Sequence, residues 1–279
     1  MPAQNTVINP LQSAKETLLG MTTAIEQRFG CTPRNDIATT LNSKFGLFPT
    51  RLPLNPKLVR YFCWGVGGRT NDDQNLSSAQ SVLGTNMAPY AIRPFRALPL
   101  VQDLTGPERE DYAMRVVQTI DGVQYVLYYL KKIDFTTSQV QYIITDPTSN
   151  VVSSYSLDPG NLSPTPPEPN TNGVISDVAD SISVVLPGIL TITGQEVFES
   201  MNVIDGGDSR YSIVSEIGFV SASTESVTAI AANGNPFSYD EAILAQMVDH
   251  YTWVGQPFLS NTDTWSRTMQ FSTKNLVLP

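Results

Sequence analysis

The sequence YAMRVVQTIDGVQYVLYYLKKI (residues 112–133) contains two apolar runs separated by a single dipeptide, Asp121-Gly122. Valine, isoleucine and tyrosine favour extended backbone, and aspartate followed by glycine tolerates the positive φ angles of a type I′ turn. The stretch therefore predicts strands at Tyr112–Ile120 and Val123–Ile133 that form an antiparallel hairpin. This hairpin belongs to an expected antiparallel β-sheet domain.

Before and after the hairpin, turn residues separate further predicted strands and one short helix. The apolar run Leu58–Trp64 ends in Gly65-Val66-Gly67-Gly68-Arg69, which predicts a buried strand that leaves through a glycine turn. Thr105-Gly106-Pro107-Glu108 has the spacing of a capping box, so a short helix is expected over Glu108–Asp111. Further strands are expected at Gln139–Thr145 and Val151–Tyr155. With 20 prolines and 18 glycines among 279 residues, the predicted class is a β-rich α+β fold.

A change of composition at residues 158–173 predicts the domain boundary. This segment, DPGNLSPTPPEPNTNG, is rich in proline and almost free of large apolar side chains, so it is expected to run extended as a linker. The predicted organisation is an N-terminal docking helix within 1–30, a β-rich domain over 31–157, the linker, and a second small β-rich domain over 174–279.

The second domain is expected to consist of short strands. Its predicted strands are Ile182–Leu186 and Ile189–Thr193 around Pro187-Gly188, Arg210–Ser221, and an edge strand that includes Met269 and Phe271. The segment Tyr239–Tyr251 is compatible with either a helix or a strand that continues into Trp253.

Residues 10–29 carry the one clear helical pattern. Apolar side chains recur at spacings of three and four, with Pro10 in the first turn and Gly30 at the C-terminal cap: Leu11, Ala14, Leu18, Met21, Ile25 and Phe29. The stripe is narrow. It can pack on its own domain or against a helix of another subunit, and the pattern leaves both alternatives open.

Composition argues against several functional classes. The chain has one histidine, two cysteines and 15% charged residues, so most catalytic side-chain types are scarce. Its net charge of −9 repels phosphate backbones and anionic lipid, which predicts no nucleic-acid and no membrane partner. Cys31 and Cys63 have no metal-ligand spacing, and we expect no metal and no cofactor. The N-terminus lacks a basic segment followed by an apolar run, so folding in the cytosol is expected.

Each candidate for chemistry has a simpler structural interpretation. His250 is the only imidazole, and its apolar surroundings favour a packed or interfacial role. Gly65–Arg69 lacks the ending of a phosphate-binding loop. The acids Glu108, Glu110 and Asp111 fall at a helix start, and Asp205 and Asp208 fall in a glycine turn where calcium is the alternative. Aromatic residues on strands favour core or interface over glycan stacking: Tyr125, Tyr128, Tyr129, Trp64, Trp253 and Trp265. No catalytic, cofactor-binding or metal-binding residue is therefore predicted.

The order of residues resembles virion structural proteins of tailed bacteriophages over roughly residues 40–160. The segments that carry this resemblance are Tyr61–Asp72, Arg93–Arg96, Asp103–Thr105, Glu108-Arg109, Tyr112–Arg115 and Gly122–Lys132. A later stretch, Arg210–Ser221, is similar to the strand ending in Glu-Ile-Gly of phage baseplate, collar and fibre-attachment proteins.

The resemblance implies a non-enzymatic subunit of the tail, in the baseplate of a contractile tail. Its partners would be other phage structural proteins, in several symmetric copies, and its location the virion, assembled in the host cytoplasm. A neck or collar component is the alternative within this class. A receptor-binding or glycan-binding module and a tail-associated hydrolase are alternatives from other classes. Low charge agrees with permanent interfaces, which are depleted of Lys and Glu.

Overall fold

The computed structural model describes residues 12–16, 24, 41–47, 57–71, 77–145, 152–154, 181–230, 236–272 and 276–277. The predicted class is confirmed, because the fold is a β-rich α+β fold built from antiparallel sheets with few helices. The chain divides into two compact units. Unit 1 comprises residues 1–133 and 192–265, and unit 2 comprises residues 134–191 and 266–279.

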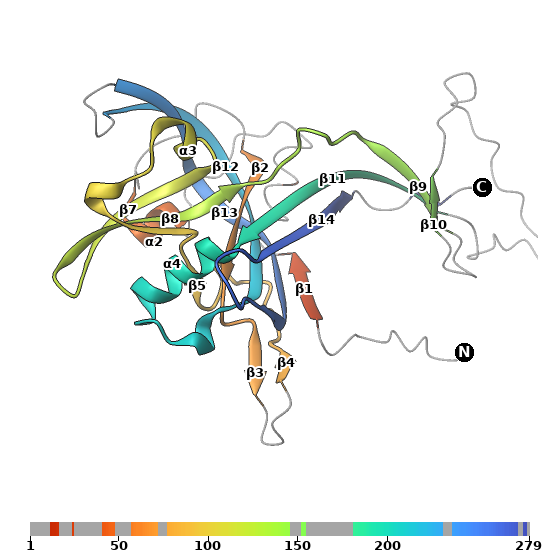
Figure 1. Ribbon diagram of the computed structural model, residues 1–279. Coiled ribbons are helices and arrows are strands. Elements are labelled where there is room, and N and C mark those ends of the chain that lie inside the picture. Colours follow the sequence, from red (N-terminus) through yellow and green to blue (C-terminus); the bar gives the residue numbers. More distant parts are fainter. Residues whose placement is uncertain are drawn as a thin grey trace, which may run out of the picture. The chain divides into compact units, whose positions relative to one another are not determined.

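Unit 1 is organised by an eight-stranded antiparallel sheet (Figure 1). Its main path runs in the order β1 (Gln12–Glu16), β13 (Pro236–Pro257), β12 (Ile213–Ile230), β2 (Leu58–Gly65), β8 (Val123–Lys132) and β6 (Arg96–Pro99). Two further strands join beside this path: β5 (Ile92–Arg93) pairs with β2, and β7 (Tyr112–Ile120) pairs with β8. A separate two-stranded ribbon is formed by β3 (Arg69–Asn71) and β4 (Ser77–Ala79).

The hairpin predicted at residues 112–133 is confirmed. Strands β7 and β8 pair from Tyr112 with Lys131 to Ile120 with Val123. Asp121 and Gly122 form the turn with φ angles of 49° and 81°. Positive φ at both central residues is the mark of a type I′ turn, as the Asp-Gly dipeptide predicts. The strand predicted at Leu58–Trp64 is also present, as β2.

The longest hairpin joins β12 to β13, and it decides the ambiguous segment 239–251. That segment is a strand, because all of it lies within β13, which pairs with β12 across a ladder with three register shifts. One irregularity lies beside Leu244, whose φ is 53°. There the side chain of Asn42 donates to the Ala242 carbonyl and accepts from the Ala245 N–H, replacing ladder hydrogen bonds.

Among the described residues, three short α-helices accompany the sheet: α2 (Leu41–Phe45), α3 (Gly106–Arg109) and α4 (Gly194–Ile204). The capping box predicted at Thr105 is present, since Glu108 accepts from the Thr105 N–H. A second capping box, Thr193 with Glu196, begins α4. Two ion pairs connect α4 and its C-terminal cap to β5 and β6: Arg93 with Asp205 at 2.6 Å, and Arg96 with Glu199 at 2.8 Å. The unit also contains the 3₁₀ turns η1 (Leu100–Gln102) and η2 (Ser209–Tyr211).

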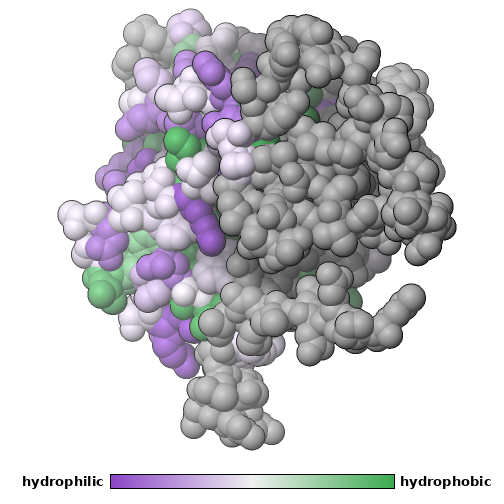
Figure 2. Space-filling model, turned by 90° about the vertical axis from the view of Figure 1, so that its right-hand side faces the viewer, coloured by the Kyte–Doolittle hydropathy of each residue, from purple (hydrophilic) through white to green (hydrophobic). Residues whose placement is uncertain are grey.

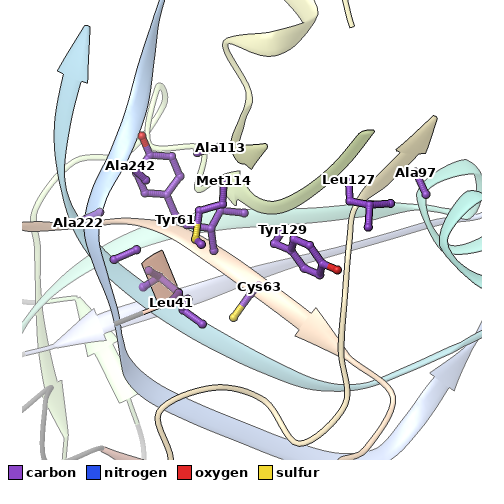
Figure 3. Close-up of a cluster of buried hydrophobic side chains, with 13 residues drawn as sticks. Leu41, Tyr61, Cys63, Ala97, Ala113, Met114, Leu127, Tyr129, Ala222 and Ala242 are labelled. Atoms are coloured by element: carbon purple, nitrogen blue, oxygen red, sulfur yellow. The ribbon is translucent and has the colours of Figure 1, made fainter. Parts of the chain in front are cut away.

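The core of unit 1 lies where β2, β8 and the β12–β13 hairpin pack with α2 (Figure 3). Tyr61, Cys63 and Leu127 are fully buried there, and Met114 and Leu41 pack in the same cluster. Burying a large apolar side chain of this kind contributes about 1.5–3 kcal/mol. The core therefore joins segments from both halves of the chain.

That core corrects the predicted domain division. Strands β12 and β13 lie in the expected second domain, 174–279, yet they pair in one sheet with β2 of the expected first domain, 31–157. Composition could not show this, because apolar strands far apart in sequence carry no mark of their partner. The linker predicted at 158–173 lies outside the described residues.

The predicted N-terminal helix is wrong at residues 12–16. These residues form β1, which pairs antiparallel with β13 from Gln12 opposite Trp253 to Glu16 opposite Asp249. Hydrogen bonding to the outer edge of β13 overrides the helical spacing of the apolar residues. Ala24 is helical, and the other residues of the 10–29 pattern lie outside the described part of the chain.

Most residues of a five-stranded sheet belong to unit 2. Its order is β10 (Val152–Ser154), β9 (Gln141–Thr145), β11 (Ser181–Thr193) and β14 (Thr264–Ser272), with β15 (Leu276–Val277) beside β11. The two strands predicted around Pro187-Gly188 are one continuous strand, β11. Its pairing with β9 ends at Val185, so Pro187 breaks no hydrogen bond of that ladder. Across the described residues, no helix has the length and apolar character needed to cross a membrane.

Candidate functional site

The most unusual group in unit 1 is the carboxylate of Glu216, which lies on β12 with none of its surface exposed. Its Oε1 accepts from the N–H groups of Gly67 at 2.9 Å and Ala91 at 2.8 Å. Its Oε2 accepts from the N–H of Tyr90 at 2.8 Å and faces Nε2 of His250 at 3.1 Å. Four N–H donors from three separate segments therefore surround one buried charge.

His250, on the neighbouring strand β13, is equally buried and completes this network. Its Nδ1 lies 3.2 Å from the side-chain amide nitrogen of Asn86. Because that amide nitrogen can only donate, Nδ1 accepts, and the ring proton resides on Nε2, which donates to Glu216. The imidazole thus bridges Asn86 and the carboxylate.

The hydrogen bonds decide the charge state of Glu216. Burial alone raises the pKa of this carboxyl group, but the donors from His250, Ala91, Tyr90 and Gly67 together outweigh burial and hold its pKa below the ordinary value. The group is therefore ionised at neutral pH. A carboxylate in this position acts as an internal anchor for backbone N–H groups.

The segment that the network holds is the loop Gln80–Ala91, which we call the docking loop. Besides the contacts to Glu216 and His250, Thr252 donates to the Gln80 carbonyl at 2.6 Å, and the ring of Tyr90 lies 5.5 Å from the imidazole. Side chains of β12 and β13 therefore hold the loop at both ends, Gln80 and Tyr90-Ala91, and at Asn86 near its centre.

Three large apolar side chains are exposed on the docking loop, beside the exposed polar residues Ser81 and Thr85. Leu83 is 62% exposed, Met87 46% and Tyr90 41%. On the face shown in Figure 2, the hydrophobic residues of the described part form separate small patches between hydrophilic ones. Exposed apolar groups on a loop held by buried hydrogen bonds suit contact with another protein.

The glycine loop and the histidine of the sequence analysis are therefore brought together here. The Gly67 N–H points at the protein's own Glu216, and the Gly68 N–H donates to Ser215 Oγ at 3.1 Å. Neither donor is directed at an external phosphate. Glu216 itself was not a predicted site residue, although a lone acid within the apolar run IVSEIGFV (residues 213–220) was an available signal.

The acidic residues that are close in sequence have different partners in the structure. Asp205 pairs with Arg93, whereas Asp208 pairs with Arg210 on its own turn at 2.6 Å, which lowers the pKa of Asp208. The pKa of Glu108 is lowered by its hydrogen bonds to Thr105. Within the described ranges, no group of three or more His, Cys, Asp or Glu side chains is arranged to hold a metal ion.

The aromatic residues and the cysteine also have defined places. Trp64, Tyr128 and Tyr129 are buried, whereas Trp253 and Trp265 are partly exposed and stack with ring centroids 6.1 Å apart. Cys63 is a buried free thiol, and burial raises its pKa to about 12. Such a thiol does not act as a nucleophile at neutral pH. Cys31 lies outside the described residues.

A family model covers nearly the whole chain. The model of a family of unknown function, DUF7208, matches residues 2–270. The chain belongs to the DUF7208 family. No curated protein and no solved structure matches it.

Proposed function

We propose that this DUF7208 protein is a non-enzymatic structural subunit of a tailed-bacteriophage virion that docks neighbouring subunits, with the baseplate of a contractile tail as its place. The observation that carries the proposal is the docking loop, in which buried polar groups hold the backbone of a loop that exposes Leu83, Met87 and Tyr90. The resemblance of roughly residues 40–160 to virion structural proteins of tailed bacteriophages supports the same function. The neck or collar is the alternative location, with the same demand for symmetric docking.

The most chemically capable side chains of unit 1 have internal roles. His250 bridges Asn86 and Glu216, and Glu196 accepts from Lys131 at 2.7 Å while capping α4. Groups engaged in this way stabilise the fold and position surface loops. This use of polar side chains fits a protein whose work is contact with neighbours.

Replacing Leu83 and Met87 together by aspartate tests the docking role. Both side chains are exposed, so the free energy of unfolding is expected to change by less than about 1 kcal/mol. Incorporation into particles is expected to fall at least about tenfold, because charges would enter an apolar contact. Incorporation is measured by quantitative mass spectrometry of purified virions after complementation of a phage that lacks the gene.

The matched control is Val101→Asp, which places a charge on another apolar residue that is 86% exposed but lies in η1. This variant is expected to enter particles normally. Equal incorporation of the docking-loop variant and the control would contradict the assignment of the docking loop. Absence of the unsubstituted protein from purified particles would contradict the virion function itself.

A glycan-binding module is a second candidate, favoured by the partly exposed pair Trp253 and Trp265. Aromatic faces bind the apolar faces of sugar rings. If this function holds, the purified protein binds members of a glycan array, and Trp265→Ala removes the signal without unfolding the protein. Binding that survives Trp265→Ala, or no binding at all, counts against this candidate.

A further inference from the structure

Strand β7, the first strand of the 112–133 hairpin, has one edge that faces away from β8. One side of β7 is paired with β8 from Tyr112 to Ile120 except at Met114, whose φ is 57° (Figure 1). At its N-terminal end, the Met114 N–H is engaged by Glu241. From Arg115 to Ile120, no strand among the described residues pairs with the other side.

The turn fixes which backbone groups face outward on this edge. In a hairpin closed by a two-residue turn, the flanking residues Ile120 and Val123 form a hydrogen-bonded pair, and hydrogen-bonded and non-hydrogen-bonded pairs then alternate. The N–H and C=O groups of Ile120 and Gln118 therefore point toward β8. Those of Thr119, Val117 and Arg115 point away from it.

The edge lacks the usual protection against pairing. Residues Val116–Thr119 contain no charge and no proline, whereas exposed edges are ordinarily blunted by lysine, proline or a bulge. Val117 is 43% exposed, and Gln118 and Thr119 are exposed as well. An edge of this composition accepts another strand.

We propose that the partner is a second copy of this chain, whose β7 edge pairs antiparallel with the first about a twofold axis at Gln118. In this register Val117 of each copy faces Thr119 of the other, and both have outward-pointing backbone groups. Other registers that use the outward groups are possible in geometry alone. The charges select this one, because it places Arg115 of each copy beside Asp121, the first turn residue of the other copy, just beyond each end of the ladder.

The side chain of Arg115 can accommodate this second acid. Its Nε and Nη2 both donate to Asp103 Oδ2, at 2.9 and 2.8 Å. Since a guanidinium has donors on three nitrogens, Nη1 remains for the second carboxylate. Each end of the paired strands would then hold an Asp–Arg–Asp arrangement.

This inference deepens the proposed function and rests on it for the claim that copies meet in a particle. A ladder of a few residues buries far less than the ~1,200 Å² of a stable interface, so isolated copies are expected to pair weakly. In an assembly, other contacts raise the effective concentration of the two edges. Pairing of the purified chain and incorporation into particles are separate measurements, so either can fail alone.

Disulfide trapping with Gln118→Cys tests the register. At the twofold axis, position 118 faces itself in a non-hydrogen-bonded pair with Cα atoms about 4.5 Å apart, a separation that a disulfide spans. Thr119→Cys is the matched control, because its Cα atoms would be about 7–8 Å apart on diagonal positions. Under a glutathione redox buffer, Gln118→Cys is expected to give roughly tenfold more cross-linked dimer than Thr119→Cys. Mass spectrometry of the linked peptides distinguishes this bond from any formed by Cys31.

A second substitution tests the backbone pairing. Val117→Pro in the Gln118→Cys background removes an outward N–H and leaves the ladder with β8 intact, so the cross-link is expected to disappear. Equal cross-linking of Gln118→Cys and Thr119→Cys would overturn the proposal, as would a cross-link that survives Val117→Pro. In purified particles that carry Gln118→Cys, a disulfide from this position to a different protein would also overturn the second-copy assignment while leaving the virion function in place.

Discussion

Glu216→Gln is expected to lower the free energy of unfolding by about 3 kcal/mol at pH 7, because it breaks a buried hydrogen-bond network without changing side-chain volume. The glutamine carbonyl can replace Oε1 and keep the Gly67 and Ala91 donors. The amide nitrogen then replaces Oε2 and faces the Tyr90 N–H, so two donors confront each other in a buried space. Urea unfolding followed by tryptophan fluorescence measures the change.

Glu241→Gln is the matched control on the adjacent strand. Glu241 is also buried, but both of its backbone donors, Met114 and Ala242, end on Oε1 and are kept by glutamine. Burial raises the pKa of Glu241, so a neutral amide removes a cost of ionisation there. This variant is expected to be at least as stable as the unsubstituted protein at pH 7. Equal destabilisation by the two substitutions would contradict the anchoring role of Glu216.

The same two residues set opposite trends with pH. Glu216 has a lowered pKa in the folded state, so its contribution to stability is present above its ordinary pKa of 4.5 and is lost as the pH falls through the folded value. Glu241 has a raised pKa, so its contribution is complete below 4.5 and is lost as the pH rises through the folded value. The stability difference between the unsubstituted protein and Glu216→Gln should therefore shrink in acid.

The hairpin at residues 112–133 was predictable because its determinants are local. The positive φ angles at Asp121 and Gly122 and the alternation of strand residues are properties of a short stretch. The capping box at Thr105 was predictable for the same reason. The pairing of β12 with β2 was not, since nothing in Glu216–Ala222 specifies Leu58–Gly65 as its neighbour before the chain folds.

The buried network illustrates the same limit. Gly67, Tyr90, Glu216 and His250 come from segments far apart in sequence, and each alone has an ordinary interpretation. The sequence correctly favoured a packed His250 but gave no reason to connect it with the glycine loop. The helical spacing near the N-terminus was misleading for a related reason, because the edge of β13 supplies hydrogen bonds that local pattern analysis cannot see.

These contacts couple the stability of the docking loop to that of the sheet. Its backbone is held by side chains of β12 and β13, and those strands contribute Val220 and Ala245 to the core. Displacing the loop therefore requires breaking buried hydrogen bonds to the sheet. Loss of one anchor should release the loop locally before the sheet unfolds.

Gly68→Ala tests the same coupling, because it disturbs the contact of the glycine loop (Gly65–Arg69) with β12. A Cβ atom on Gly68 would overlap the Ser215 carbonyl oxygen, and it would lie 2.6 Å from the Ser215 carbonyl carbon and 3.0 Å from Glu216 Cβ. Because most of this obstruction is backbone of β12, it cannot be relieved by a side-chain rotation. We expect a loss of about 3 kcal/mol in the free energy of unfolding.

The control for this substitution is Gly106→Ala, whose Cβ would approach only the side chain of Phe237, at 3.2 Å. Gly106 begins α3, where alanine has the better helix propensity, so the change is expected to stay within about 1 kcal/mol. Combined with Glu216→Gln, Gly68→Ala should cost less than the sum of the two single effects, because each releases the same loop from β12. Additive losses, or equal losses for Gly68→Ala and Gly106→Ala, would show that the glycine loop and Glu216 do not act as one unit.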